Sequence, residues 1–167
     1  TTVLTEDVVD VDFSKKPYIV RAKQSSFETD AVIIATGATA NRLKIPGAGD
    51  GEFWQKGVTA CAVCDGAMPI FRNKPLYVIG GGDSAVEEAT FLTKFGSKVY
   101  LVHRRDKLRA SKIMQERAMN HPKIEILWDS EISSIEGDDV VRSVKITNKK
   151  TNTTTQHEAA GVFFAVG

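Results

Sequence analysis

The segment Leu76-Tyr-Val-Ile79-Gly80-Gly-Gly-Asp-Ser-Ala85 decides the fold of this chain. Its apolar residues predict a buried strand, and the glycines that follow predict a tight turn. Apolar residues then recur at helical spacing over residues 84–95, and Gly96 stands where a helix-ending glycine belongs. The segment therefore predicts a strand, a glycine turn and a helix in direct succession.

The alternation of strand and helix continues beyond this segment. Residues 98–102 predict a second strand and residues 123–128 a third. Between them, residues 111–120 predict a helix that stops before Pro122. Strands that alternate with helices form a parallel, doubly wound α/β sheet. The alternation then ends, and we expect an antiparallel β excursion with strands at 132–136, 140–147 and 157–166 and a long polar turn at 151–155.

The N-terminal third carries short β signals instead. Residues 8–13 alternate apolar with acidic side chains over part of their length, and residues 18–23 predict a second strand. The continuous apolar run Ala31-Val-Ile-Ile-Ala35 predicts a strand buried on both faces. Residues 39–57 are loop-like, with a proline and several glycines, so we expect a domain boundary there.

The balance of charges excludes several classes of protein. Twenty-two basic residues face twenty-one acidic ones, and a net charge of +1 gives no global attraction to nucleic acid or to a membrane. No apolar run approaches the roughly 18–20 residues that span a bilayer, and no signal peptide is recognisable. We expect a soluble, intracellular protein. Because the chain begins at Thr1 without methionine and ends directly after a strand-like run, we also expect a piece of a longer polypeptide.

The glycine turn has the spacing of a dinucleotide-binding site. Gly80-x-Gly82-x-x-Ala85 follows a strand and opens a helix inside a β-α-β unit. Gly80 permits the tight turn, Gly82 lets the backbone approach a pyrophosphate, and small Ala85 allows the helix to pack closely on the sheet. The free N–H groups of the first helical turn, which begins at Asp83 and Ser84, face the phosphates. A glycine-rich turn without a ligand is the alternative.

The end of the second strand indicates which dinucleotide binds. A site for NADH would place Asp or Glu there, about 20 residues after the glycines. Instead the strand ends Val102-His103-Arg104-Arg105, and Arg109 follows four residues after Arg105. Guanidinium groups bind a phosphate with two hydrogen bonds and keep their charge at any working pH. We therefore predict NADPH, held through its 2′-phosphate. A solvated basic turn is the alternative.

The only two cysteines, Cys61 and Cys64, form a Cys-x-x-Cys motif. In an intracellular α/β protein this motif suggests a redox-active dithiol, whose thiolate a following helix N-terminus can stabilise. Asp65 is placed to donate or accept a proton when the disulfide ring opens. Half of a zinc site and a pair of inert buried cysteines are the alternatives. The three histidines are scattered without ligand-like spacing, so no metal is predicted.

Taken in order along the chain, these motifs resemble those of the low-molecular-weight thioredoxin reductases, the class II pyridine nucleotide-disulfide oxidoreductases. In the larger lipoamide-dehydrogenase-like reductases, the cysteines lie early in the FAD domain and are spaced Cys-x4-Cys. Here they stand between an Ala-Thr-Gly segment and the glycine turn, and the resemblance covers essentially the whole chain. The matching segments are Ala35-Thr-Gly-Ala38, Cys61-Ala-Val-Cys-Asp-Gly66, Gly80-Gly-Gly-Asp-Ser-Ala85, His103-Arg-Arg-Asp106 and Arg109-Ala-Ser111.

The resemblance implies a division into three segments. Residues 1–37 would belong to an FAD-binding domain, and residues 38–162 would form a Rossmann-like NADPH-binding domain that contains the cysteine pair. Residues 163–167 would return to the FAD domain. Nicotinamide and disulfide must take turns at the flavin, so hinges are expected near residues 38–47 and 163–167.

The resemblance also implies a route for electrons. Hydride passes from NADPH to FAD, two electrons then reduce the Cys61–Cys64 disulfide, and the dithiol reduces thioredoxin. Cys64 would face the flavin, Cys61 would attack thioredoxin, and Asp65 would act as acid and base. The implied contacts to NADPH are Gly80, Gly82, Asp83, Ser84, Ala85, His103, Arg104, Arg105 and Arg109, and those to FAD are Val8, Thr36, Gly37 and Cys64.

Partners and location follow from the same resemblance. Members of this family are usually homodimers, and we expect a cytoplasmic protein or, alternatively, a mitochondrial or plastid one. Two other functions stay open. One is a related flavoprotein that reduces a peroxiredoxin-like partner, and the other is an NADPH-binding module without turnover of its own.

Overall fold

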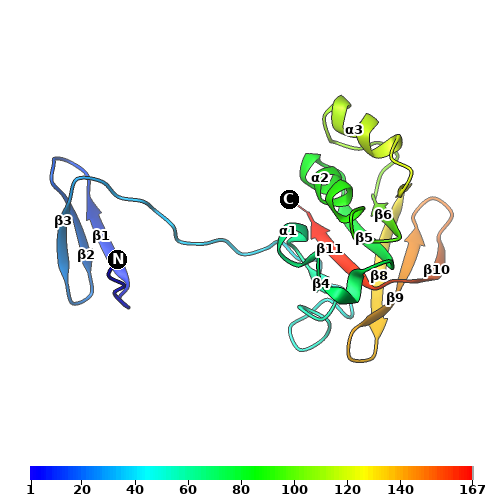
Figure 1. Ribbon diagram of the computed structural model, residues 1–167, viewed down its shortest axis with the longest axis horizontal. Coiled ribbons are helices and arrows are strands. Elements are labelled where there is room, and N and C mark those ends of the chain that lie inside the picture. Colours follow the sequence, from blue (N-terminus) through cyan, green and yellow to red (C-terminus); the bar gives the residue numbers. More distant parts are fainter. Residues whose placement is uncertain (167) are drawn as a thin grey trace. The chain divides into compact units, whose positions relative to one another are not determined.

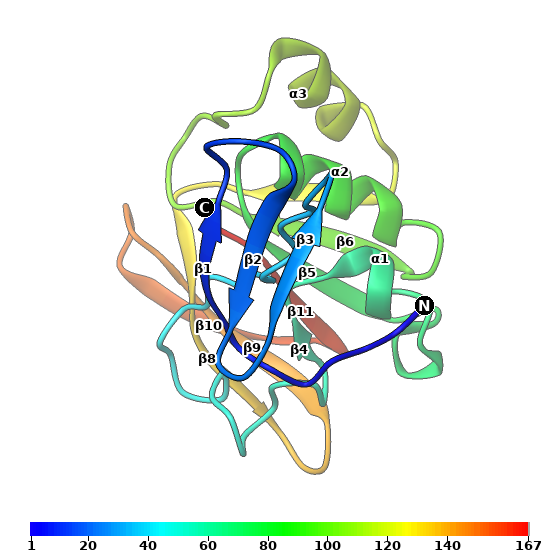
Figure 2. The same cartoon turned by 90° about the vertical axis from the view of Figure 1, so that its left-hand side faces the viewer.

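The chain is divided into two compact units in the computed structural model, which describes residues 1–166. The first unit, residues 1–39, contains an antiparallel sheet in the order β1-β2-β3 (Figure 2), formed by β1 (Val8–Asp12), β2 (Tyr18–Ala22) and β3 (Ser26–Thr29). β1 and β2 confirm the strands predicted near residues 8–13 and 18–23. β3 was not predicted, because Phe27 is its only apolar residue.

The strand predicted at Ala31-Val-Ile-Ile-Ala35 is wrong. Residues 31–45 contain no helix or strand, and the side chains of Ile33 and Ile34 are 91% and 74% exposed. A β-strand is stabilised by hydrogen bonds to a neighbouring strand. Within residues 1–166 no strand pairs with this run. Apolar composition alone therefore does not produce a strand here, because pairing decides the outcome.

The second unit begins at Ala40 and is built around a five-stranded parallel sheet in the order β4-β11-β5-β6-β7, of which Figure 1 labels β4, β11, β5 and β6. Its strands are β4 (Val58–Thr59), β5 (Pro75–Gly80), β6 (Lys98–Val102), β7 (Ile124–Leu127) and β11 (Gly161–Ala165). β11 comes last in the chain but lies inside the sheet, paired with both β4 and β5. The parallel order confirms the α/β sheet predicted from the alternation of strands and helices.

Helices pack on one face of this sheet. α2 (Asp83–Leu92) contacts β5 and β6, and α3 (Lys112–Met119) contacts β7. α2 ends before residue 95, the predicted end, because the Lys94 and Phe95 N–H groups donate to carbonyls three residues back instead of four. The short helices α1 (Ala62–Asp65) and η1 (Pro69–Phe71) stand between β4 and β5 in the chain. Within residues 1–166, every helix is too short or too polar to cross a membrane.

The other face of the parallel sheet packs against an antiparallel sheet. β8 (Ser130–Gly137), β9 (Val141–Asn148) and β10 (Thr153–Glu158) form it in the order β10-β9-β8. Successive residues of a strand point to opposite faces. Thus Val78 of β5 joins the core under the helices, whereas Tyr77 and Ile79 join the core that contains Ile132 and Val144. The predicted antiparallel excursion is confirmed.

Two details of the C-terminal part were predicted wrongly. Residues 157–166, expected as one strand, supply the end of β10 and all of β11, which belong to different sheets. Residues 151–155, expected as a turn, include the start of β10. β10 is an edge strand whose side chains are nearly all exposed. Its threonines suit a strand, but they give no apolar alternation by which it could be recognised.

Candidate functional site

A cavity of about 680 Å³ opens at the carboxyl ends of β5 and β6. This is the edge at which parallel α/β sheets bind their ligands. Every residue predicted to contact NADPH lines the cavity, except Ala85. The sheet topology therefore gathers the glycine turn and the basic loop after β6 around one space.

The three glycines of the turn differ in their surroundings. A Cβ on Gly80 would lie 2.5 Å from a backbone oxygen of β11 and 2.6 Å from Cβ of Ala85, so close packing, rather than the turn itself, requires glycine there. A Cβ on Gly81 would lie 2.2 Å from Nδ1 of His103. A Cβ on Gly82 would have nothing within 4 Å, and Gly82 is the N-cap of α2 without a side-chain cap. Free helix N–H groups beside open space fit a pyrophosphate.

The ring of His103 lies between the glycine turn and the loop after β6. This ring is buried, with Nδ1 3.0 Å from the Gly80 carbonyl oxygen and Nε2 2.9 Å from the Lys107 carbonyl oxygen. Each ring nitrogen faces a backbone carbonyl oxygen, and the nitrogen that carries a proton donates to it. The side chain joins the glycine turn to the loop after β6 and so helps to shape the cavity that it lines.

The three arginines predicted to bind a 2′-phosphate lie on the loop after β6. Arg104, Arg105 and Arg109 are exposed and line the cavity. The Arg109 N–H donates to the Gly81 carbonyl at 2.7 Å, which ties this loop to the turn. Among residues 1–166, no ion pair neutralises any of the three guanidinium groups. Their charge is available to an anion in the cavity.

Asp83 and Ser84 occupy the first turn of α2 and have different surroundings. Asp83 Oδ1 accepts hydrogen bonds from the Ser111 N–H at 2.8 Å and the Ser111 hydroxyl at 3.0 Å. This carboxylate thus ties α2 to the residue that caps α3. Ser84 is exposed and lines the cavity. Of the two, Ser84 is better suited to meet a phosphate, because a carboxylate would repel it.

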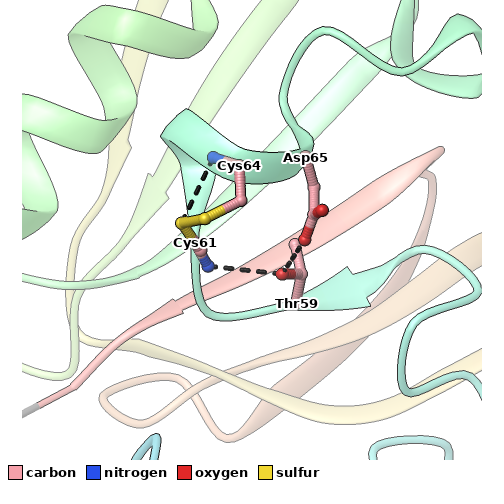
Figure 3. The surroundings of a disulfide bond; sticks show 4 residues. All are labelled: Thr59, Cys61, Cys64 and Asp65. Carbon is pink, nitrogen blue, oxygen red and sulfur yellow. Dashed lines mark hydrogen bonds between the residues drawn. A yellow bond between two sulfur atoms is a disulfide. The ribbon is translucent and has the colours of Figure 1, made fainter. Parts of the chain in front are cut away.

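The two cysteines form a disulfide at the start of α1 (Figure 3). Cys61 is the N-cap of this helix, and the Cys64 N–H donates to Cys61 Sγ at 3.2 Å. An N–H group at a helix start stabilises a thiolate in this position. Cys61 is half-buried, whereas Cys64 and Val63 are exposed. The helix start expected beside the pair is therefore present.

Thr59 connects Cys61 with Asp65, as Figure 3 shows. Its Oγ1 donates to Asp65 Oδ2 at 2.5 Å and accepts from the Cys61 N–H at 3.2 Å. Thr59 is the second residue of β4, and only 3% of it is exposed. The pair of cysteines and the adjacent carboxylate are thus fixed to the parallel sheet through one side chain.

A second carboxylate with an unusual environment lies on α2. Burial raises the pKa of Glu88 from its ordinary 4.5 to about 7, and the neighbouring charge of Glu87 adds to the rise. Glu88 Oε2 is buried and has no hydrogen-bond partner among residues 1–166. Ionisation of Glu88 therefore has a cost in the folded chain.

The residues predicted to contact FAD are divided between the two units. Val8 begins β1 and is exposed, and Thr36 and Gly37 lie in the segment without helix or strand. Gly37 has a positive φ of 79°. Cys64 belongs to the second unit. The NADPH set is gathered within one unit, whereas the FAD set is not.

A family profile described as pyridine nucleotide-disulphide oxidoreductase matches residues 1–167. The chain belongs to the pyridine nucleotide-disulphide oxidoreductase family. Both parts of the family description have a counterpart in the second unit. The glycine turn and arginine loop line a cavity of the size of a nucleotide site, and Cys61 and Cys64 form the disulfide.

Curated relatives in the pyridine nucleotide-disulphide oxidoreductase family are named thioredoxin reductase. The protein of Chlamydia pneumoniae is 65% identical over 167 residues, which cover 100% of this chain and 54% of that protein. "Thioredoxin reductase 1, mitochondrial" of Arabidopsis thaliana is 55% identical over 172 aligned positions, covering 100% of this chain and 46% of that protein. The chain thus spans about half the length of the curated relatives it matches.

Solved structures of this family agree with the fold. Thioredoxin reductase from Giardia duodenalis matches with a TM-score of 0.83 and 48% identity, covering 98% of this chain and 53% of that one. Thioredoxin reductase of Lactococcus lactis matches with a TM-score of 0.78 and 45% identity, covering 97% of this chain and 52% of that one. The combination of parallel and antiparallel sheets is therefore a fold of known pyridine nucleotide-disulphide oxidoreductases.

Several residues at the family's site carried no motif that sequence reasoning could use. Ser130 and Glu131 begin β8 and line the cavity. They follow β7, and the rule that ligands lie beyond the carboxyl ends of parallel strands would have pointed to them. Leu43, which also lines the cavity, comes from a segment read only as a loop. Thr59 stands near the cysteines in sequence, but nothing marked its hydroxyl as part of the redox site.

Proposed function

We propose that this chain is part of a thioredoxin reductase, which passes two electrons from NADPH through FAD and the Cys61–Cys64 disulfide to thioredoxin. One observation carries the proposal: a disulfide and a cavity suited to a dinucleotide occur in the same folded unit. The name shared by relatives at 65% and 55% identity supports thioredoxin as the substrate.

The nucleotide in this proposal is NADPH rather than NADH. Its pyrophosphate would lie at the N-terminus of α2, where Gly82 leaves open space. Its 2′-phosphate would meet Arg104, Arg105 and Arg109, whose charges no ion pair neutralises among residues 1–166. His103 would keep the loop and the turn in register.

FAD is the second cofactor in the proposal. When bound, it would accept a hydride from NADPH and supply two electrons to the disulfide. Val8, Thr36 and Gly37 would contact it from the first unit and Cys64 from the second. Gly37 fits such a contact, since it has a φ of 79° and no atom within 4 Å of its Cβ position. Cys64 is an exposed residue, which fits a contact with a ring system.

The chain's own residues would handle the sulfur chemistry and the protons. Two electrons and one proton open the disulfide and leave a thiolate on Cys61, stabilised by the Cys64 N–H, and a thiol on Cys64. The Cys61 thiolate attacks the thioredoxin disulfide, which forms a mixed disulfide and frees one thioredoxin thiolate. Cys64 then gives its proton to Asp65 and attacks Cys61 Sγ. This step restores the disulfide and frees the second thioredoxin sulfur as a thiolate.

The proposal assigns residues 1–37 to the FAD-binding part and residues 38–162 to the NADPH-binding part, with residues 163–167 leading back to the former. The division of the chain after Thr39 supports the first boundary. The second hinge was expected near residues 163–167. Because Gly161–Ala165 form β11 and pair with β5, we propose that this hinge follows Ala165. Gly167 lies outside the described residues. The intact protein would be a homodimer of the cytoplasm or of an organelle, with no nucleic acid or membrane partner.

The test uses the full-length protein with Cys61→Ser or Cys64→Ser, and Val63→Ala as a control between them. Each cysteine variant should lose thioredoxin reduction, followed as NADPH oxidation, because neither can form the disulfide. NADPH should still reduce the flavin in both variants, observed in a stopped-flow spectrometer. The Val63 variant should retain both steps. Thioredoxin turnover in either cysteine variant would contradict the proposal. If the unsubstituted protein reduces a peroxiredoxin-like protein and not thioredoxin, the proposed substrate is wrong.

A further inference from the structure

We propose that Thr59 is a positioning residue of the redox pair: its hydroxyl fixes the carboxylate of Asp65 and leaves only Oδ1 of that carboxylate to carry a proton. The role of Thr59 in thioredoxin reduction rests on the function proposed above. The chemistry itself is a property of the thiols and can be tested without flavin, nucleotide or thioredoxin.

The direction of each hydrogen bond at Thr59 follows from the donors available. The Cys61 backbone N–H can only donate, so Thr59 Oγ1 accepts from it at 3.2 Å. A hydroxyl has one proton, and Asp65 Oδ2 lies 2.5 Å from Oγ1. The Thr59 proton therefore points to Asp65 Oδ2, and that oxygen acts as an acceptor. A hydrogen bond to a carboxylate of this kind is stronger than one between neutral groups.

Thr59 itself has little freedom to move. It is 3% exposed and pairs with Phe163 of β11 in the parallel sheet. Its branched Cβ restricts the side chain to few rotamers. In Figure 3 its hydroxyl stands between the Cys61 backbone and the Asp65 carboxylate. The sheet therefore determines where the carboxylate lies relative to the cysteine pair.

This arrangement matters when the disulfide re-forms. In that step Cys64 loses its proton, its sulfur attacks Cys61 Sγ, the bond from Cys61 to the partner sulfur breaks, and the partner leaves as a thiolate. Asp65 accepts the proton on Oδ1, because Thr59 donates to Oδ2. Without the hydroxyl, the carboxylate is free to rotate away, and misplacement of a proton acceptor by about 1 Å costs up to roughly a hundredfold in rate.

The experiment follows the reduced chain as it reacts with 5,5′-dithiobis(2-nitrobenzoate). The Cys61 thiolate releases the first nitrothiobenzoate, and attack by Cys64 on the mixed disulfide releases the second. Thr59→Val keeps the side-chain shape but removes the hydroxyl, and Thr59→Ser keeps the hydroxyl. In Thr59→Val the second release should slow by about ten- to a hundredfold while the first stays unchanged. Thr59→Ser should restore the second rate to within about threefold of the original chain.

A role through Asp65 has a signature that a merely structural role lacks. In an Asp65→Asn background, where the proton acceptor is absent, Thr59→Val should slow the second release no further. Equal slowing with and without Asp65, or a Thr59→Val rate equal to that of the original chain, would overturn the proposal. Circular dichroism verifies folding of each variant, and Thr59→Ala replaces Thr59→Val if the latter does not fold. Failure of the thioredoxin assay leaves this result unaffected, since the reagent replaces thioredoxin.

Discussion

Substitution of Glu88 by glutamine should stabilise the second unit much more at pH 8 than at pH 5. Burial is the main cause that raises the pKa of Glu88 to about 7 from 4.5, and Glu87 adds to it. The folded chain therefore holds a proton on Glu88 between about pH 4.5 and pH 7 that the unfolded chain has released. Stability from this group is fully present below pH 4.5 and is lost as pH rises to about 7.

The magnitude follows from the size of this pKa difference. A rise from 4.5 to about 7 corresponds to about 3 kcal/mol for a fully buried group. Glu88 is only partly buried, and screening by solvent reduces the expected effect to about 1–2 kcal/mol. Glutamine has nearly the shape of the neutral acid and does not ionise, so Glu88→Gln should recover this amount at pH 8.

Urea denaturation at both pH values, followed by tryptophan fluorescence, measures the effect. Both tryptophans, Trp54 and Trp128, belong to the second unit, so the signal reports that unit alone. The quantity to compare is the difference in free energy of unfolding between Glu88→Gln and the original chain, measured at pH 5 and at pH 8. Any effect of the amide that does not depend on pH cancels in this comparison. Glu116→Gln, on an exposed position of α3, should show no such change. An equal advantage for Glu88→Gln at pH 5 and pH 8 would refute the reasoning.

Three further predictions concern the dinucleotide cavity. Replacing Arg104 and Arg105 by alanine should weaken NADPH binding far more than NADH binding, as calorimetry would measure, by ~1.5–3 kcal/mol for each charge-assisted hydrogen bond to the 2′-phosphate that the substitution removes. Equal losses of affinity for the two nucleotides would mean that these arginines do not bind the 2′-phosphate. Gly81→Ala should destabilise the second unit by about 1–3 kcal/mol, because the new Cβ would lie 2.2 Å from Nδ1 of His103. Gly82→Ala meets nothing within 4 Å, so it should leave the melting temperature unchanged but abolish NADPH binding; unaltered NADPH affinity would place the pyrophosphate elsewhere.

The parts of the fold that sequence predicted well are those specified by local pattern. The apolar run, glycine turn and helix around Gly80 need only their own residues to be recognised, and the strand at Lys98–Val102 has the predicted bounds. The same holds for the basic loop, since position after a strand and residue type together define it. These features place the residues predicted to contact NADPH on one edge of the sheet before any tertiary contact is considered.

The parts that sequence missed depend on partners distant in the chain. Ile33 and Ile34 have strand composition but no pairing strand among residues 1–166. β10 has a pairing strand but no apolar pattern. Thr59 acquires its role from a sheet register with Phe163, more than a hundred positions away. Local pattern contains no information about such pairings. The hydrogen bonds of Thr59 to Cys61 and Asp65 join residues near in sequence, but no sequence motif marks the Thr59 hydroxyl as their partner.

The position of β11 also constrains the order of events on the ribosome. β5, β6 and β7 can pair once Leu127 has emerged from the exit tunnel. Within residues 1–166, β4 has no neighbour in the sheet except β11, apart from a single bridge to Trp54. The cysteine segment is therefore translated long before β11, and in that interval α1 can already pack on α2, whereas β4 still lacks its partner strand. The strand that carries Thr59 thus completes its place in the parallel sheet only after Gly161–Ala165 has been made, later than β5, β6 and β7.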